Sequence, residues 1–584
     1  MNKEIKNKKT IIALICVVLV QVVYITIIFG IHKVGYHSDE LSHYTFANNY
    51  SVGAEKLNNE QFEMGEWVDS YSLWERITVE PEHRFSYLSV NNNASGDVNP
   101  PMHYYILHTI CSIFPGTFSK WYCFIINIVC FAVGQVYLFF LANKITRGSI
   151  TASMSVLILY GFGVGCFNTT SYLRMYSMAT CIAIIFAYYS YILFENRRDK
   201  DKKKIIFLLI AIFFSCFLGS YTLHLFLVYA FGITICYTLY YLFSGNWKLF
   251  IAHGTSCAFS VGLSFVLVPS TSSHVFQSVD TYSYALQMYP QKWQFRLLWY
   301  IMTKDLFGAH ISPWPRPILA YTSIALIIVL FFVVPFCFIF RKEKWFSTWK
   351  VKIKNSGINT IKQIKSFQFG LVPLGFASFL LVLIISYRAS VYAMQWYIDR
   401  YLFIVYPTFV IFVICTIYYI IKLLSNKATV CGVIVFFVSI FFMIWSNVVS
   451  NHVYYFDYPS EGFTFDNIEK DADVILLLSA RWQLNSFTIE LWDTDKYYAT
   501  DFRRFMDDEY SLEKTSGKPV YLLVDQNYVL RDDEELPEWK EDSIMKHEYE
   551  ILDFYKGLDG VENITYLGMD GIFGKDIKIY KIEM

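Results

Sequence analysis

The sequence predicts a polytopic α-helical membrane protein with a soluble α/β domain at its C-terminal end. Of the 584 residues, 55% are hydrophobic and only 17% are charged, which is more apolar surface than one water-soluble core can bury. Eleven apolar runs are long enough to cross a bilayer. After residue 450 these runs give way to short strand-like runs, and we place a domain boundary there.

The eleven runs each approach the roughly 20 residues that a helix needs to cross the hydrocarbon core. They cover 11–32, 121–143, 149–168, 172–194, 205–220, 222–243, 249–268, 316–340, 368–386, 400–422 and 429–449. The first run follows a Lys-rich start, as in a secretion signal, but it is too long for one and has no small-residue cleavage site. We therefore expect it to remain as the first span.

One shorter apolar segment, Pro101 to Phe114, follows a further proline and has about fourteen residues. Its length favours a re-entrant or interfacial helix over a crossing. With this segment left out of the count, short loops rich in Lys and Arg, such as 197–204 and 341–365, fall on the cytoplasmic side with the N-terminus. The aromatic loop 269–315 is then extracytoplasmic and fits a segment on the membrane surface.

The same topology places the loop after the first span and the whole tail outside the cell. We expect a transmembrane domain over 1–450, which includes the extracytoplasmic loop 33–99, and a soluble extracytoplasmic α/β domain over 451–584. The stretch from Asn451 to Met584 has 30 acidic and 14 basic residues, so it gives no support to a nucleic-acid partner. Strands are predicted at 474–478, 520–524 and 577–582.

Several kinds of chemistry lack support in the sequence. All twelve Cys residues lie in apolar segments, so no disulfide framework is predicted for the exposed parts, and no CxxC pair indicates a zinc site. Phosphate-cradling Gly-rich loops and the HExxH and GxSxG motifs are absent from the sequence. Nucleotide hydrolysis and serine or zinc peptidase activity are therefore unsupported.

The pair Asp39–Glu40 is the first candidate for catalysis. It follows the first span by a few residues, so both carboxylates are expected at the outer membrane surface, where one can be partly desolvated. Adjacent carboxylates favour the neutral form in each other, which suits a general base. The alternative interpretation is a pair of ordinary solvated loop residues.

Motifs spread in order along the membrane region resemble the GT-C glycosyltransferases that use polyprenyl-phosphate sugars, such as protein O-mannosyltransferases and aminoarabinose transferases. The motifs are His-Ser-Asp-Glu at 37–40, Asn-Pro-Pro-Met-His-Tyr-Tyr at 99–105, Tyr-Leu-Arg-Met-Tyr-Ser at 172–177, Asp-Arg-Tyr-Leu at 399–402, and Tyr-Pro at 406–407. Met102 stands where the family usually has Leu, and Asn99 where it often has His or Lys. These departures bear on which substrate is used.

The resemblance implies transfer of a sugar from a polyprenyl-phosphate donor to an extracytoplasmic acceptor hydroxyl or amine, with inversion at the anomeric carbon. Asp39 would take the acceptor proton and Glu40 would orient that base or the acceptor. Arg174 and Arg400 would offset the charge that develops on the leaving phosphate. The alternative for either arginine is snorkelling to the membrane surface.

Other residues are candidates for substrate binding, because the motifs or the predicted topology place most of them at the outer ends of their segments. They are His103, Tyr105, Tyr176, His224 and Arg388. A lone His near a helix end is more often structural. No metal is obligatory, since a lipid phosphate flanked by cations leaves readily, but some GT-C enzymes use a divalent metal. The implied partners are the donor, the acceptor and membrane lipids.

Two other function classes stay open. A transporter or flippase of lipid-linked sugars would share the spans and the arginines, but is expected to have charged residues near mid-membrane and repeated halves, and the sequence shows neither. A non-catalytic cell-surface assembly or receptor protein would use the acidic tail and would tolerate the loss of Asp39.

Overall fold

The computed structural model describes residues 8–50, 64–97, 99–267, 295–307, 369–388, 398–424, 428–448, 460–478, 481–501, 517–525, 541–572 and 575–584. The chain divides into two compact units, each built from separate stretches of sequence. Unit 1 comprises Met1–Ile27, Ile125–Ser171 and Met175–His452, and unit 2 comprises Ile28–Phe124, Tyr172–Arg174 and Val453–Met584. The loop 33–99, which the sequence analysis grouped with the spans, thus falls in the same unit as the tail.

Within the described residues, seven helices are long and apolar enough to cross a membrane. They are α1 (Lys8–His32), α7 (Lys120–Ile145), α10 (Tyr176–Glu195), α11 (Lys202–Ser220), α12 (Leu225–Phe243), α13 (Trp247–Leu267) and α21 (Tyr406–Leu424), the last extended at its start by η4 (Ile398–Val405). An eighth candidate is the pair α8 (Ile150–Gly161) and α9 (Val164–Ser171), which is bent by 58°. The chain is therefore a helical protein suited to membrane insertion.

Two further helices, α20 (Leu371–Arg388) and α22 (Ala428–Val448), contain shorter apolar stretches, and α15 (Phe295–Phe307) precedes them. The predicted run 316–340 and most of the loop 269–315 lie outside the described residues. The count of eleven spans accordingly stays a prediction.

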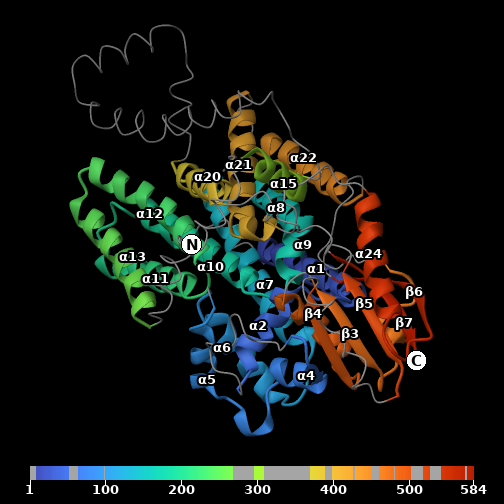
Figure 1. Cartoon of the computed structure of the whole chain (residues 1–584). Coiled ribbons are helices and arrows are strands. Elements are labelled where there is room, and N and C mark those ends of the chain that lie inside the picture. Colours follow the sequence, from blue (N-terminus) through green and yellow to red (C-terminus); the bar gives the residue numbers. More distant parts are fainter. Residues whose placement is uncertain are drawn as a thin grey trace. The chain divides into compact units, whose positions relative to one another are not determined.

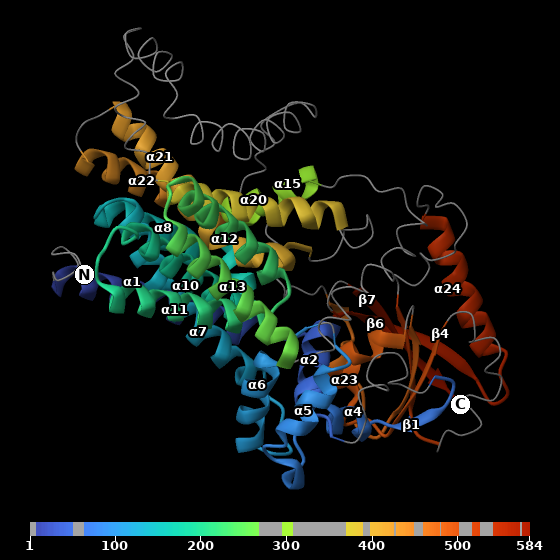
Figure 2. The same cartoon turned by 90° about the vertical axis from the view of Figure 1, so that its left-hand side faces the viewer.

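The outer surfaces of the unit 1 helices are apolar. Helices α10, α11, α12 and α13 lie side by side (Figure 2). Large side chains such as Phe207, Phe214, Phe259 and Val266 are exposed on α11 and α13, while polar Ser260 is buried. An apolar exterior around buried polar groups is expected of helices that face lipid.

Unit 2 contains a mixed sheet of seven strands within the described residues, in the order β1-β4-β3-β5-β7-β6-β2. Figure 1 shows strands β3 to β7 of this sheet. The strands are β1 (Trp67–Asp69), β2 (Glu461–Gly462), β3 (Asp473–Leu478), β4 (Lys496–Asp501), β5 (Val520–Asp525), β6 (Asn563–Ile572) and β7 (Lys575–Glu583). The three runs predicted as strands are β3, β5 and most of β7. Strand β3 pairs in parallel with β4 and β5, and the other pairings are antiparallel.

The centre of the sheet is buried on both faces, which is why β3 and β5 are continuous apolar runs. Val474, Leu476 and Leu478 point into one hydrophobic cluster, and the alternate residues of β3 point into a second. Helix α24 (Glu541–Lys556) contributes Ile551 to the second cluster.

The first loop is part of this sheet. In the sequence, strand β1 comes after α2 and well before α7. In the structure it pairs with β4 of the tail, with Trp67 opposite Tyr498. The rings of Trp74 and Trp492 pack 4.3 Å apart, and the hydroxyl groups of Ser70 and Thr494 are 2.9 Å apart. The first loop and the tail therefore form one folded body.

Short helices complete unit 2. They are α2 (Ser38–Asn48), α4 (Tyr71–Ile77), η1 (Pro81–His83), α5 (Tyr87–Ala94), α6 (Met102–Ile113), η5 (Phe465–Asn467), η6 (Arg481–Phe487) and α23 (Thr488–Leu491). Helix α6 begins directly after Pro101 and coincides with the predicted short helix. Helix α2 packs against α4, α5, α6 and η6, and α4 also contacts α23 (Figure 2).

Candidate active site

The first turn of α2 fixes the directions of Asp39 and Glu40. His37 caps the helix: its ring Nδ1 accepts a hydrogen bond from the backbone N–H of Asp39 at 2.9 Å. The Glu40 side chain reaches back and accepts from the backbone N–H of His37 at 2.8 Å. This reciprocal arrangement is a capping box, and it holds both carboxylates at a helix N-terminus, where negative charge is favoured.

Glu40 is fully buried and points inward. Its two oxygens accept from the Lys33 ammonium at 2.9 and 2.7 Å, and Oε1 also accepts from the backbone N–H of Leu173 at 2.8 Å. Lys33 is fully buried too, and burial lowers its pKa although Glu40 opposes the shift. Glu40 is therefore an anchor that joins the end of α1 to the segment 172–174.

Asp39 points outward, and its side chain is 31% exposed. Its Oδ2 accepts from Arg174 Nη1 at 2.7 Å and from the Tyr172 hydroxyl at 3.3 Å. The neighbouring carboxylates thus face different cations, Arg174 for Asp39 and Lys33 for Glu40. Arginine contact stabilises the charged form of a carboxylate.

His37 and Tyr172 extend the hydrogen bonding around Asp39. Because His37 Nδ1 accepts the backbone N–H of Asp39, this nitrogen carries no proton, and its 3.8 Å approach to Asp39 Oδ2 is no ion pair. The Tyr172 hydroxyl is 3.3 Å from both His37 Nδ1 and Asp39 Oδ2, and it has one proton to donate. His37 and Tyr172 therefore help to fix the position of the Asp39 carboxylate.

His103 and Tyr105 contact residues of unit 2 that brace α6. His103 is fully buried, and its Nδ1 is 2.6 Å from His43 Nε2. Burial, followed by the charges of His103 and Arg174, holds the pKa of His43 well below its usual value. The Tyr105 hydroxyl donates to Asn91 of α5 at 3.1 Å. These contacts fit structural roles for both residues.

Four predicted residues belong to unit 1. Tyr176 opens α10 and packs edge-on against Phe403. His224 is the N-terminal cap of α12. The Arg400 guanidinium lies over the ring of Tyr401, 5.1 Å from its centre. Arg388 is the last residue of α20, and its side chain lies outside the described residues.

Unit 1 also holds a carboxyl pair that the sequence analysis missed. Asp305 of α15 is buried and accepts from the Tyr406 hydroxyl at 2.7 Å, and Asp399 of η4 is buried as well. Burial, followed by the charge of Asp399, raises the pKa of Asp305 well above its usual range. Two buried acids side by side favour the neutral form of a carboxyl group.

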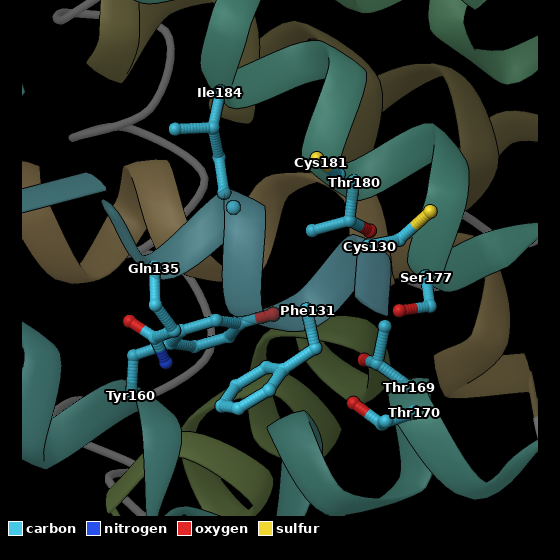
Figure 3. A pocket seen from close by; sticks show the side chains of 11 residues that line it. Cys130, Phe131, Gln135, Tyr160, Thr169, Thr170, Ser177, Thr180, Cys181 and Ile184 are labelled. Atoms are coloured by element: carbon cyan, nitrogen blue, oxygen red, sulfur yellow. The ribbon is translucent and has the colours of Figure 1, made fainter. Parts of the chain in front are cut away.

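A small pocket inside unit 1 is lined by Thr169, Thr170, Ser177, Thr180 and Gln135 together with apolar residues and two Cys (Figure 3). Its space open to water is about 10 Å³, which is room for about one molecule. The sequence-predicted site residues are not among those that line it. Over the described parts of the chain, three or more His, Cys, Asp or Glu side chains do not gather in a group that could hold a metal ion.

Neither a protein-family model nor a curated protein matches this chain. The function is therefore argued from the geometry around Asp39 together with the motif resemblance.

Proposed function

We propose that the protein is a GT-C-like glycosyltransferase that moves a sugar from a polyprenyl-phosphate donor to an extracytoplasmic acceptor. This proposal rests on the opposite directions of the two carboxylates at the start of α2. Glu40 is buried and bound by Lys33 and the backbone N–H of Leu173, while Asp39 is partly exposed and contacts Arg174. A rigidly oriented, accessible carboxylate beside an arginine suits a base that works next to an anionic leaving group.

The pairing of β1 with β4 supports the proposed topology. Two strands of one sheet lie on one side of a membrane, so the chain crosses an even number of times between the first loop and the tail. With the first span, the total is odd. The seven long helices, the bent pair α8–α9 and the shorter helices α20 and α22 make ten candidate spans among the described residues. The predicted run 316–340 supplies an eleventh. The positive-inside rule then puts the N-terminus in the cytoplasm and the tail outside.

In the proposed reaction the acceptor oxygen or nitrogen attacks the anomeric carbon while Asp39 takes its proton. The bond from that carbon to the phosphate oxygen breaks, its electron pair stays on the phosphate, and polyprenyl phosphate leaves. Arg174 contacts Asp39 through Nη1, and its planar fork of N–H donors is the kind of group that binds phosphate oxygens. Arg400, which belongs to unit 1, stays a phosphate contact that the motif resemblance alone predicts. The scheme requires no metal and leaves room for one.

The test uses purified protein in proteoliposomes that contain the polyprenyl-phosphate sugars extracted from producing cells. Sugar transfer predicts release of free polyprenyl phosphate when cell-envelope acceptor material is added. Asp39→Asn is expected to stop the release, and Asp69→Asn, a change at an exposed carboxylate of the same loop, is expected to leave it intact. Equal release by protein-free liposomes would exclude the proposed activity.

A transporter of lipid-linked sugars is the second candidate, and the 58° bend between α8 and α9 favours it. Broken helices of this kind occur at the substrate sites of transporters. Transport predicts that intact lipid-linked sugar changes leaflet without release of polyprenyl phosphate, so the same proteoliposomes distinguish the two functions.

A further inference from the structure

Helix α2 has one open face, and Asp39 shares it with a single other residue. Nine of its 11 residues are buried. The two that are not, Asp39 and Ser42, are three positions apart, which places them on the same side of the helix one turn from each other. A substrate that reaches Asp39 along α2 therefore passes Ser42.

The tail contributes the neighbour of Ser42. The Asn485 side chain donates from Nδ2 to Ser42 Oγ at 2.9 Å. Asn485 belongs to η6, the turn that follows β3, and η6 packs along α2. The polar residues Gln483, Asn485 and Ser486 of η6 are each 4–5% exposed, although such side chains usually face water. The tail thus places the buried polar residues of η6 next to α2.

The sheet topology gives a second reason to expect a ligand here. Strand β3 has β4 on one side and β5 on the other, all three in parallel, so the strand order reverses at β3. Ligands of such sheets bind outside the carboxyl ends of the strands, at the point of reversal. The segment η6 begins three residues after the end of β3, at that edge.

We propose that η6 forms the acceptor side of the site, with Asn485 as the residue that orients the acceptor. The inference rests on the proposed function. In an inverting displacement the attacking group and the leaving phosphate lie on opposite faces of the sugar ring. Arg174 occupies the donor side of Asp39, so the acceptor has to approach Asp39 from elsewhere. The Ser42–Asn485 face of α2 offers that approach.

The chemistry of this face selects an acceptor class. A carboxamide offers two N–H donors and a carbonyl oxygen, of which the contact with Ser42 uses one donor. Such groups pair with hydroxyls. The tail has 30 acidic and 14 basic residues, and its net negative charge disfavours an anionic acceptor. We infer a neutral, hydroxyl-bearing glycan.

The experiment separates acceptor use from donor use. The donor is the polyprenyl-phosphate sugar purified from cells that lack the protein, and the acceptor is neutral glycan from their envelope. Two rates are measured: transfer to the glycan, and the slower transfer to water, which needs no acceptor site. Asn485→Ala is expected to raise the acceptor KM about tenfold, with donor KM and hydrolysis within about twofold.

Two variants serve as controls. Asn485→Ser replaces the carboxamide with a shorter hydroxyl that can also donate and accept, so its acceptor KM should fall between those of wild type and Asn485→Ala. Asn563→Ala removes an exposed carboxamide on β6 that contacts Thr565, and it should behave as wild type.

An unchanged acceptor KM in Asn485→Ala, with transfer intact, would overturn the inference and leave the proposed function standing. A parallel fall in hydrolysis and transfer would show that Asn485 only supports the fold, and would also overturn the inference. If the wild-type protein neither transfers nor hydrolyses the donor, the proposed function itself fails.

Discussion

The carboxylates at the start of α2 and the carboxyl pair of α15 and η4 are handled in opposite ways. In the first region each acid has its own cation, Lys33 for Glu40 and Arg174 for Asp39. In the second, Asp305 lies near another acid, and it accepts a hydrogen bond from the neutral hydroxyl of Tyr406. The first region places a cation against each acid, and the second places one buried acid near another. Only a charged, accessible carboxylate is ready to take a proton from an acceptor.

We expect the largest effect on turnover from a substitution of Asp39, compared with the same substitution of Asp305. Asp39→Asn keeps the shape of the side chain but cannot take a proton, so turnover should fall by about 10²- to 10⁴-fold. Burial raises the pKa of Asp305 and Asn keeps the shape of the side chain, so Asp305→Asn should change turnover little. Transfer assays on both variants check this, with the amount of folded protein first matched by thermal melting. Comparable losses in the two variants would remove the distinction between the regions.

A large effect on stability is expected from the buried ion pair. Glu40→Gln or Lys33→Met alone leaves one buried charge without its partner, which should cost about 3–5 kcal/mol of unfolding free energy. The double variant should recover much of that loss, because neither charge remains. A double-mutant cycle of thermal or denaturant unfolding in detergent measures the coupling. Additive losses would mean that the two residues act independently.

The arginines give the next effect. Arg174→Ala and Arg400→Ala should raise the donor KM about 10- to 100-fold, the range of one lost charge-assisted contact, and slow turnover. The lysine variants keep the charge but lose the planar fork, so they should retain more activity. Kinetics with donor and acceptor varied separately test this. Snorkelling instead predicts unchanged kinetics and slightly altered insertion.

The smallest effect concerns Glu490 of α23, a carboxyl in unit 2 that behaves like Asp305. Burial, with Asp570 and Asp466, raises its pKa to about 8. Between its unfolded value and pH 8 the folded protein binds more protons than the unfolded chain, so stability falls as pH rises through this window. Glu490→Gln should therefore raise the melting temperature at pH 8 more than at pH 5. An equal change in melting temperature at pH 5 and pH 8 would show that the Glu490 carboxyl does not titrate in this range.

Sequence patterns predicted the elements whose signal is long or repeated. The apolar helices, the strands β3 and β5 and the helix after Pro101 were predicted from their runs of residues. Strand β1 was missed, because three residues are too few for an alternating pattern. Its pairing with β4 joins segments about 430 residues apart, a contact that no local signal encodes.

The candidate site was predicted only in part, because local motifs identify residues but do not encode the contacts that these residues make in the fold. Asp39, Glu40 and Arg174 stand in motifs, but their division of work depends on which way each side chain turns. Lys33 follows an apolar span, where lysine usually snorkels, and only the fold shows it buried against Glu40. Asp305 lies in a loop that was interpreted as a surface anchor, and its partner Asp399 is about 90 residues away.

The most direct test of the central claim is mass analysis of lipid-linked sugars and surface glycans in three strains: one with the wild-type protein, one without it, and one with Asp39→Asn. If the protein transfers a sugar with Asp39 as the base, one polyprenyl-phosphate sugar accumulates in the last two strains, and the same sugar is lost from an extracytoplasmic glycan. Identical lipid and glycan profiles in all three strains would contradict it.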